Sequence, residues 1–119
     1  MFISDLDDTL KQRMTMLSFA DYQQFAKQTD KYPAANKTAT LALGLAGEAG
    51  EVANKVKKIY RDGVLNPDAI ADELGDVLWY VAMLAHELDI PLEAIARMNL
   101  DKLADRAARG AIGGNGDNR

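Results

Sequence analysis

Two pairs of carboxylates, each three residues apart, constrain this chain more than any other feature. Glu48 and Glu51 form the first pair, and Glu73 and Asp76 form the second. Positions three apart lie on one face of a helix, and a projection at about 100° per residue places both pairs within apolar stripes. We therefore expect four inward carboxylates. Because unpaired buried charge is costly, these oxygen ligands indicate a hard cation such as Mg²⁺ or Mn²⁺.

The stripes around these pairs predict the helices that carry them. The first stripe continues through Leu41, Leu45, Val52 and Ile59, and the second through Val77, Tyr80 and Leu84. We expect a helix over residues 36–60 and another over 67–88, paired antiparallel with the metal site between them. Asn66 and Pro67 provide an N-cap and a first-turn proline for the second of these helices.

Two further helices complete the prediction of an all-α bundle of four helices. Ser18 starts the first with a capping box and Tyr32-Pro33 stops it, so that it covers about residues 19–29. Pro91 opens the last, over residues 91–109. Polar Asn99, Lys102 and Arg106 share its apolar stripe, as the carboxylates do on their helices.

Three glycines at a spacing of three also interrupt the first carboxylate-bearing helix. Gly44, Gly47 and Gly50 are poor helix formers. Their presence suggests the close approach of another backbone or of a ligand.

Composition excludes several classes of protein. The chain has 119 residues, no cysteine and a net charge of −4. Thiolate chemistry is therefore excluded, and the acidic balance argues against a nucleic-acid partner. No apolar run approaches the roughly 20 residues of a membrane span, and no signal peptide is visible. We expect a reducing, cytoplasmic setting, which is the host cytoplasm for a phage-encoded chain.

The ends of the chain differ from its centre. We expect an N-terminal extension over residues 1–15, a helical domain over 16–109 and a flexible glycine-rich tail over 110–119. The extension contains Asp5 and Asp7 in a pattern that resembles the first motif of haloacid-dehalogenase phosphatases, but no parallel-sheet pattern follows. A short helix capped by Ser4, with Asp7 at the capping-box position, is the favoured interpretation.

The carboxylate segments also carry a family resemblance. The chain is similar to MazG-like all-α nucleoside triphosphate pyrophosphohydrolases, whose signature is ExxE followed some twenty residues later by ExxD. The matching segments are Gly44-Leu-Ala-Gly-Glu-Ala-Gly-Glu-Val and Glu73-Leu-Gly-Asp-Val-Leu-Trp-Tyr. The spacing Asn99-x-x-Lys102-x-x-x-Arg106 also matches, so the resemblance runs from about Met16 to Arg106. The short single-domain form resembles versions found in phages and bacteria.

The resemblance implies hydrolysis of a (deoxy)nucleoside triphosphate between the α and β phosphates, giving monophosphate and pyrophosphate. It assigns metal binding to Glu48, Glu51, Glu73 and Asp76, with Glu48 or Glu51 also a candidate catalytic base. Candidate substrate contacts are Lys55 and Tyr80, which continue the two carboxylate stripes, and Asn99, Lys102 and Arg106 of the matching spacing on the last helix. Three of these keep simpler alternatives, because Lys55 could pair with Glu51, Tyr80 could be core, and Arg106 could form a surface salt bridge.

Several alternatives remain open from the sequence. A purine nucleotide such as dGTP is our guess for the substrate, with dUTP or dCTP as the alternatives. A non-catalytic metal-binding helical module is the alternative of another class. A lone helix pair leaves one face open, and the helix over 67–88 is apolar around more than half of its circumference. We therefore expect a homo-oligomer, a tetramer or a dimer.

Overall fold

The computed structural model describes residues 17–113, which form four α-helices with no strand among them. The helices are α2 (Phe19–Lys27), α3 (Lys37–Asp62), α4 (Pro67–Glu87) and α5 (Leu92–Ala108). This confirms the predicted all-α fold. The expected extension with Ser4, Asp5 and Asp7, and the tail from residue 114, lie outside the described residues, so the domain boundaries remain predictions. Within residues 17–113, no helix is long and apolar enough to cross a membrane.

Local capping explains why three of these helix ends fall close to where the sequence places them. The Ser18 hydroxyl accepts a hydrogen bond from the amide of Asp21, and the Asn66 side chain accepts one from the amide of Ala69. Both bonds satisfy amides that the first turn of a helix leaves without a backbone partner. Gly63 ends α3 in the left-handed conformation, with φ of 72°.

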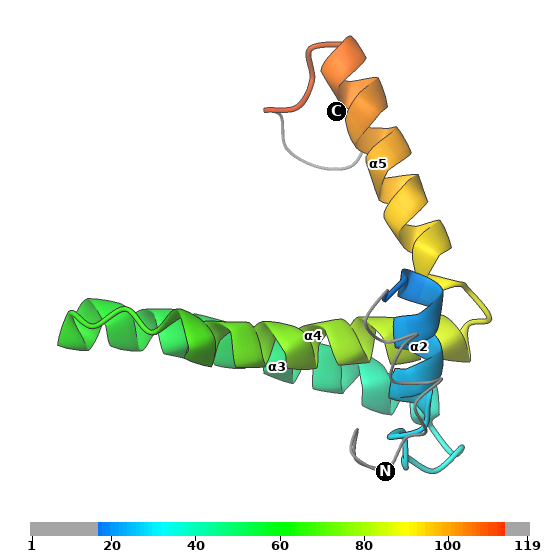
Figure 1. The fold of residues 1–119 in the computed structure, drawn as a ribbon, viewed down its shortest axis with the longest axis horizontal. Helices are drawn as coiled ribbons and strands as arrows, with labels where there is room; N and C mark the ends of the chain where they lie inside the picture. Colours follow the sequence, from blue (N-terminus) through cyan, green and yellow to red (C-terminus); the bar gives the residue numbers. More distant parts are fainter. Residues whose placement is uncertain (1–16, 114–119) are drawn as a thin grey trace.

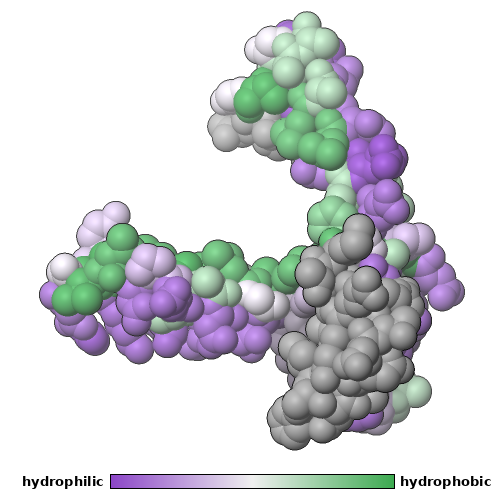
Figure 2. All heavy atoms as spheres, in the orientation of Figure 1, coloured by the Kyte–Doolittle hydropathy of each residue, from purple (hydrophilic) through white to green (hydrophobic). Residues whose placement is uncertain are grey.

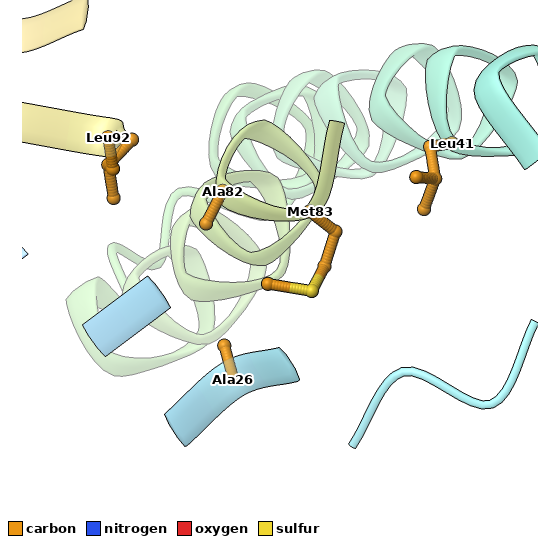
Figure 3. Close-up of a cluster of buried hydrophobic side chains, with 5 residues drawn as sticks. All are labelled: Ala26, Leu41, Ala82, Met83 and Leu92. Carbon is orange, nitrogen blue, oxygen red and sulfur yellow. The ribbon is translucent and has the colours of Figure 1, made fainter. Parts of the chain in front are cut away.

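The two long helices α3 and α4 lie side by side and form an extended arm (Figure 1). The short α2 packs against α4 at the end of the arm opposite to the α3–α4 connection. There the small core brings together one or two residues from each helix (Figure 3). Its fully or almost fully buried members are Ala26, Leu41, Ala82, Met83 and Leu92.

Helix α5 leaves this core and leads away from the arm (Figure 1). Its start is held by Gln23 of α2, whose amide nitrogen donates to the carbonyls of Ala82 and Ile90 at 3.2 and 3.1 Å. The side-chain oxygen of Gln23 accepts from the amide of Leu92 at 3.0 Å. The turn itself places Asp89 in the left-handed region, with φ of 58°. Gln23 thus determines how α5 departs from α4.

Much apolar surface stays exposed along the arm and on α5. Figure 2 shows apolar residues along one side of the α3–α4 arm and over parts of α5. The most exposed large apolar side chains of the described part are Tyr60, Leu43, Met98, Val64, Leu65 and Leu100. Exposed apolar surface on this scale marks an interaction surface.

Candidate metal and nucleotide site

Three of the four predicted carboxylates meet between the two long helices. Glu48 of α3 and Glu73 and Asp76 of α4 each offer one oxygen, and these oxygens lie within 4.8 Å of one another. Glu48 and Glu73 are half-buried and Asp76 is exposed, so the group opens toward solvent. We call these three residues the carboxylate cluster.

The neighbouring carboxylates and partial burial disfavour negative charge on Glu48. The pKa of Glu48 is raised, first by desolvation, then by the charge of Asp76 and by Glu73 and Glu51. A divalent cation held by three carboxylates relieves this repulsion, and all-oxygen ligands suit Mg²⁺ or Mn²⁺. The donor set therefore fits the metal that the sequence pattern predicts.

Glu51 and Lys55 occupy the edges of this site. Glu51 is exposed and is not one of the three carboxylates that meet, although its charge acts on Glu48. Lys55 lies across the helix pair with its Nζ 4.0 Å from Glu73 Oε1. The structure thus pairs Lys55 with Glu73 of α4, and not with Glu51 of its own helix as one interpretation of the sequence had it.

Tyr80 connects the cluster to a group of aromatic rings. It lies one turn after Asp76, and its hydroxyl is 2.7 Å from the hydroxyl of Tyr32. Its ring also makes an edge-on contact with Trp79, with centroids 4.9 Å apart. The hydrogen bond with Tyr32, together with burial and the charges of Tyr32, Glu48 and Asp76, raises the pKa of Tyr80 to about 12. Tyr80 therefore remains a neutral hydroxyl beside the carboxylates.

These rings line a cavity of about 310 Å³, which we call the aromatic cavity. Its lining residues come from the second half of α4 and from the segment after α2, and they are Thr29, Lys31, Tyr32, Trp79 and Tyr80. The sequence pattern singled out Tyr80 alone as a substrate contact. Tyr32 was noted only as the residue before a helix-stopping proline, because nothing local shows that it meets a ring 48 residues away.

The three polar residues predicted on the last helix lie elsewhere in the chain. Asn99 and Lys102 line a separate cavity of about 340 Å³ with Ile90, Ile95 and Met98. Arg106 is buried farther along α5. Since α5 leads away from the arm (Figure 1), the fold of one chain does not bring this stripe beside the carboxylate cluster.

Comparison with known proteins identifies the family. Residues 36–110 match the family described as MazG nucleotide pyrophosphohydrolase domain. The Gene 37 protein of Mycobacterium phage L5 is 50% identical over 109 residues, a match that covers 82% of this chain and 96% of that protein. No solved structure matches the chain significantly. With a family match across both carboxylate-bearing helices and all of α5, the chain belongs to the MazG nucleotide pyrophosphohydrolase family.

Proposed function

We propose that the chain hydrolyses a (deoxy)nucleoside triphosphate at the α–β phosphate bond, in a reaction that depends on Mg²⁺ or Mn²⁺. The observation that carries this proposal is the meeting of Glu48, Glu73 and Asp76 beside the aromatic cavity, in a chain whose family hydrolyses nucleotides. The products would be monophosphate and pyrophosphate, and the role would be control of a nucleotide pool. We place this role in the cytoplasm, which for a phage-encoded chain is the host's.

The carboxylates divide the chemistry between them. A bound divalent cation neutralises phosphate charge and lowers the pKa of a water that it binds. The carboxylate cluster would hold the cation, and Glu51 would complete the ligand set at the solvent edge. Glu48 and Glu51 are the candidates for the base that accepts the proton of the attacking water.

The nucleotide would lie along α4, with its base toward the aromatic cavity and its phosphates toward the cluster. Asp76 and Tyr80 are four residues apart, which is about 6 Å along a helix axis. Sugar and α-phosphate can bridge such a gap. Lys55, already beside Glu73, would contact a phosphate oxygen.

We also propose that the active form is a homo-oligomer, a tetramer or a dimer. Among the described residues, Leu43, Tyr60 and Met98 are 74%, 88% and 68% exposed. Large apolar side chains of this kind are covered by a partner subunit in permanent interfaces. In such an assembly Asn99, Lys102 and Arg106 would contact the substrate from a second chain, because the fold of one chain does not bring them beside the carboxylate cluster. Sedimentation equilibrium should give a mass two or four times that of the chain, and a monomer at micromolar concentration would contradict the proposal.

The decisive experiment is a screen of the canonical ribo- and deoxyribonucleoside triphosphates with Mg²⁺ and with Mn²⁺, with products separated by chromatography. We expect monophosphate and pyrophosphate from the wild-type chain, at least about 100-fold less from Asp76→Asn, and unchanged amounts from Asp72→Asn. Asp72 is the matched control, because it is exposed on the same helix and outside the cluster. Release of orthophosphate would contradict the proposed bond cleavage. No turnover with metal still bound would favour the non-catalytic metal-binding module.

A further inference from the structure

The hydrogen-bonding groups around the aromatic cavity are unequally distributed between donors and acceptors. The Thr29 hydroxyl donates to the carbonyl of Ala26 at 2.7 Å and accepts from the indole nitrogen of Trp79 at 2.8 Å. The hydroxyl hydrogen of Thr29 and the indole hydrogen of Trp79 are therefore both bonded within the protein. Two side-chain groups of the lining remain to address a ligand, which are the Lys31 ammonium and the paired hydroxyls of Tyr32 and Tyr80.

Of these remaining groups, the Lys31 ammonium can only donate, whereas the tyrosine hydroxyls can both donate and accept. An ammonium has three donors and no acceptor. In the tyrosine pair, one hydroxyl donates to the other at 2.7 Å, so the hydrogen of the second hydroxyl is left to point at a ligand. None of the five lining residues carries a carboxylate or an amide side chain that would accept strongly from a ligand.

From this arrangement we propose that the aromatic cavity selects nucleobases that present a carbonyl oxygen, and that Lys31 is a residue that determines this specificity. The relevant position is C6 of a purine or C4 of a pyrimidine, where guanine, hypoxanthine, uracil and thymine carry an oxygen and adenine and cytosine carry an amino group. The inference rests on the proposed function, because it assumes that the cavity holds the base of the substrate. Among the substrates considered above, it retains dGTP and dUTP and rejects dCTP.

The selection follows from the cost of opposing two donors. A carbonyl oxygen placed at the cavity mouth accepts from Lys31 or from the free tyrosine hydrogen. An amino group in the same place cannot pair with the Lys31 ammonium, and among the lining side chains it finds acceptors in the tyrosine hydroxyl oxygens. A lining that presents a donor-only group to the base therefore favours a carbonyl oxygen over an amino group at that position. The aromatic walls of Tyr32, Trp79 and Tyr80 contribute stacking, which every base accepts and which does not discriminate.

The cavity is placed correctly relative to the cluster for this role. Tyr80 belongs to both, since it lines the cavity and lies close enough to Glu48 and Asp76 for their charges to act on its hydroxyl. The cavity volume of about 310 Å³ is roughly ten times the ~30 Å³ that a water molecule occupies in the liquid. That is room for the ten or so heavy atoms of a purine and for part of its sugar.

The test measures binding separately from hydrolysis. Isothermal titration of the full chain with the α,β-imido analogues of dGTP, dUTP, dATP and dCTP, in Mg²⁺, gives four dissociation constants that need no turnover. We expect the dGTP and dUTP analogues to bind at least about tenfold more tightly than the dATP and dCTP analogues. Equal affinities, or tighter binding of the amino bases, would overturn the inference.

Two lysine variants identify the responsible group. Lys31→Met keeps the length of the side chain and removes its donors, so we expect the preference for carbonyl bases to fall to about threefold or less. Lys57→Met is the matched control, because Lys57 is exposed and lies nine residues after Glu48, on the opposite side of α3. We expect the control to keep the full preference, and a full preference in Lys31→Met would overturn the role given to Lys31.

The failure of this inference is distinguishable from failure of the proposed function. Monophosphate and pyrophosphate formed equally well from all four nucleotides would uphold the pyrophosphohydrolase and overturn the selection. Selective binding of the dGTP and dUTP analogues without turnover of the parent nucleotides would uphold the selection and contradict the enzyme. Melting curves of both lysine variants verify that they are folded before affinities are compared.

Discussion

The backbone of Gly44 lies directly against the ring of Tyr80, so that a methyl group added at Gly44 would overlap three atoms of that ring. Of the three glycines spaced along this part of α3, Gly44 alone is in such a contact, since a methyl group at Gly47 or Gly50 would meet nothing within 4 Å. The glycine pattern thus marks one close approach, between α3 and the aromatic ring that adjoins the carboxylate cluster.

This contact predicts opposite outcomes for two identical substitutions. Gly44→Ala should destabilise the fold by about 1–3 kcal/mol, because the Tyr80 ring must move to make room. It should also lower kcat/KM for the nucleotide. Gly47→Ala should stabilise the fold by up to about 1 kcal/mol, because alanine favours the helix and the site is open. Urea unfolding gives the change in the free energy of unfolding for each variant. A change of the same sign in both would contradict the Gly44–Tyr80 contact.

Divalent cations should stabilise the folded chain through the carboxylate cluster. Binding to the folded state contributes about 2.7 kcal/mol when the free ion is at one hundred times its dissociation constant. Thermal unfolding with added Mg²⁺ or Mn²⁺ should show this as a rise in Tm. Glu48→Gln should lose most of the rise, and Asp72→Asn should keep it. A Tm that does not respond to either ion in the wild-type chain would contradict the metal site.

Without metal, Glu48 should make the wild-type chain less stable as pH rises. Its pKa is raised in the folded state, so the folded state favours the protonated form. Stability from this group is fully present below its ordinary pKa of 4.5 and falls as pH rises through the raised folded value. In EDTA near neutral pH, Glu48→Gln should therefore be more stable than wild type. Melting curves of both proteins in EDTA at several pH values measure this pH dependence. A Glu48→Gln variant less stable than wild type at neutral pH would contradict it.

Asp30 should stabilise the segment that carries Lys31 and Tyr32. Its side chain is almost fully buried and accepts from Lys37 at 2.8 Å, from Lys27 at 3.1 Å and from the amide of Tyr32 at 3.1 Å. Burial alone would raise the pKa of Asp30, but the hydrogen bonds from the two lysines and from Tyr32 lower it. Asp30→Asn should cost about 2 kcal/mol near neutral pH.

The pH dependence separates this ionic effect from a packing effect. Because the folded pKa of Asp30 is lowered, its contribution is present above the unfolded value and is lost as pH falls through the folded value. The stability difference between wild type and Asp30→Asn should therefore shrink below about pH 4. A difference that stays constant from pH 7 to pH 3 would show that the charge of Asp30 is not responsible.

Gln23 should control the departure of α5 from α4. Gln23→Leu removes three hydrogen bonds and leaves the Ile90 carbonyl and the Leu92 amide without this partner, which should cost about 1–3 kcal/mol. The exposed neighbour Gln24 offers the control Gln24→Leu, which should change stability little. Hydrogen exchange of the Leu92 amide should accelerate in Gln23→Leu only. An unchanged exchange rate of the Leu92 amide in Gln23→Leu would contradict this role of Gln23.

The helices were predictable because their determinants are local. Ser18, Asn66 and Gly63 satisfy or end the backbone within four residues of their own position, so the sequence alone locates these ends. The carboxylate cluster was predictable to the level of the helix face. Which glutamate faces α4 was not, since Glu48 and Glu51 differ by about 60° around the helix and the path of α4 covers only the first.

The aromatic cavity and the direction of α5 depend on contacts between distant residues. Tyr32 meets Tyr80 across 48 positions, and Gln23 bonds to the Leu92 amide across 69. No periodic pattern encodes such pairings, because each depends on how complete helices pack. The residue in the left-handed conformation at the turn before α5 is Asp89 and not a glycine, so the sequence does not indicate this turn. The sequence therefore predicts the presence of α5 but not its direction.

The carboxylates that we propose for hydrolysis and the residue Lys31 that we propose for base selection lie on different elements of this chain. The carboxylate cluster lies on two long helices fastened to each other, whereas Lys31 and Tyr32 lie on the short stretch between α2 and α3. Substitutions in a connecting segment disturb a fold less than substitutions in packed helices. Relatives of this chain can therefore diverge in the base that they accept by exchanging a few loop positions while the hydrolytic chemistry is inherited intact.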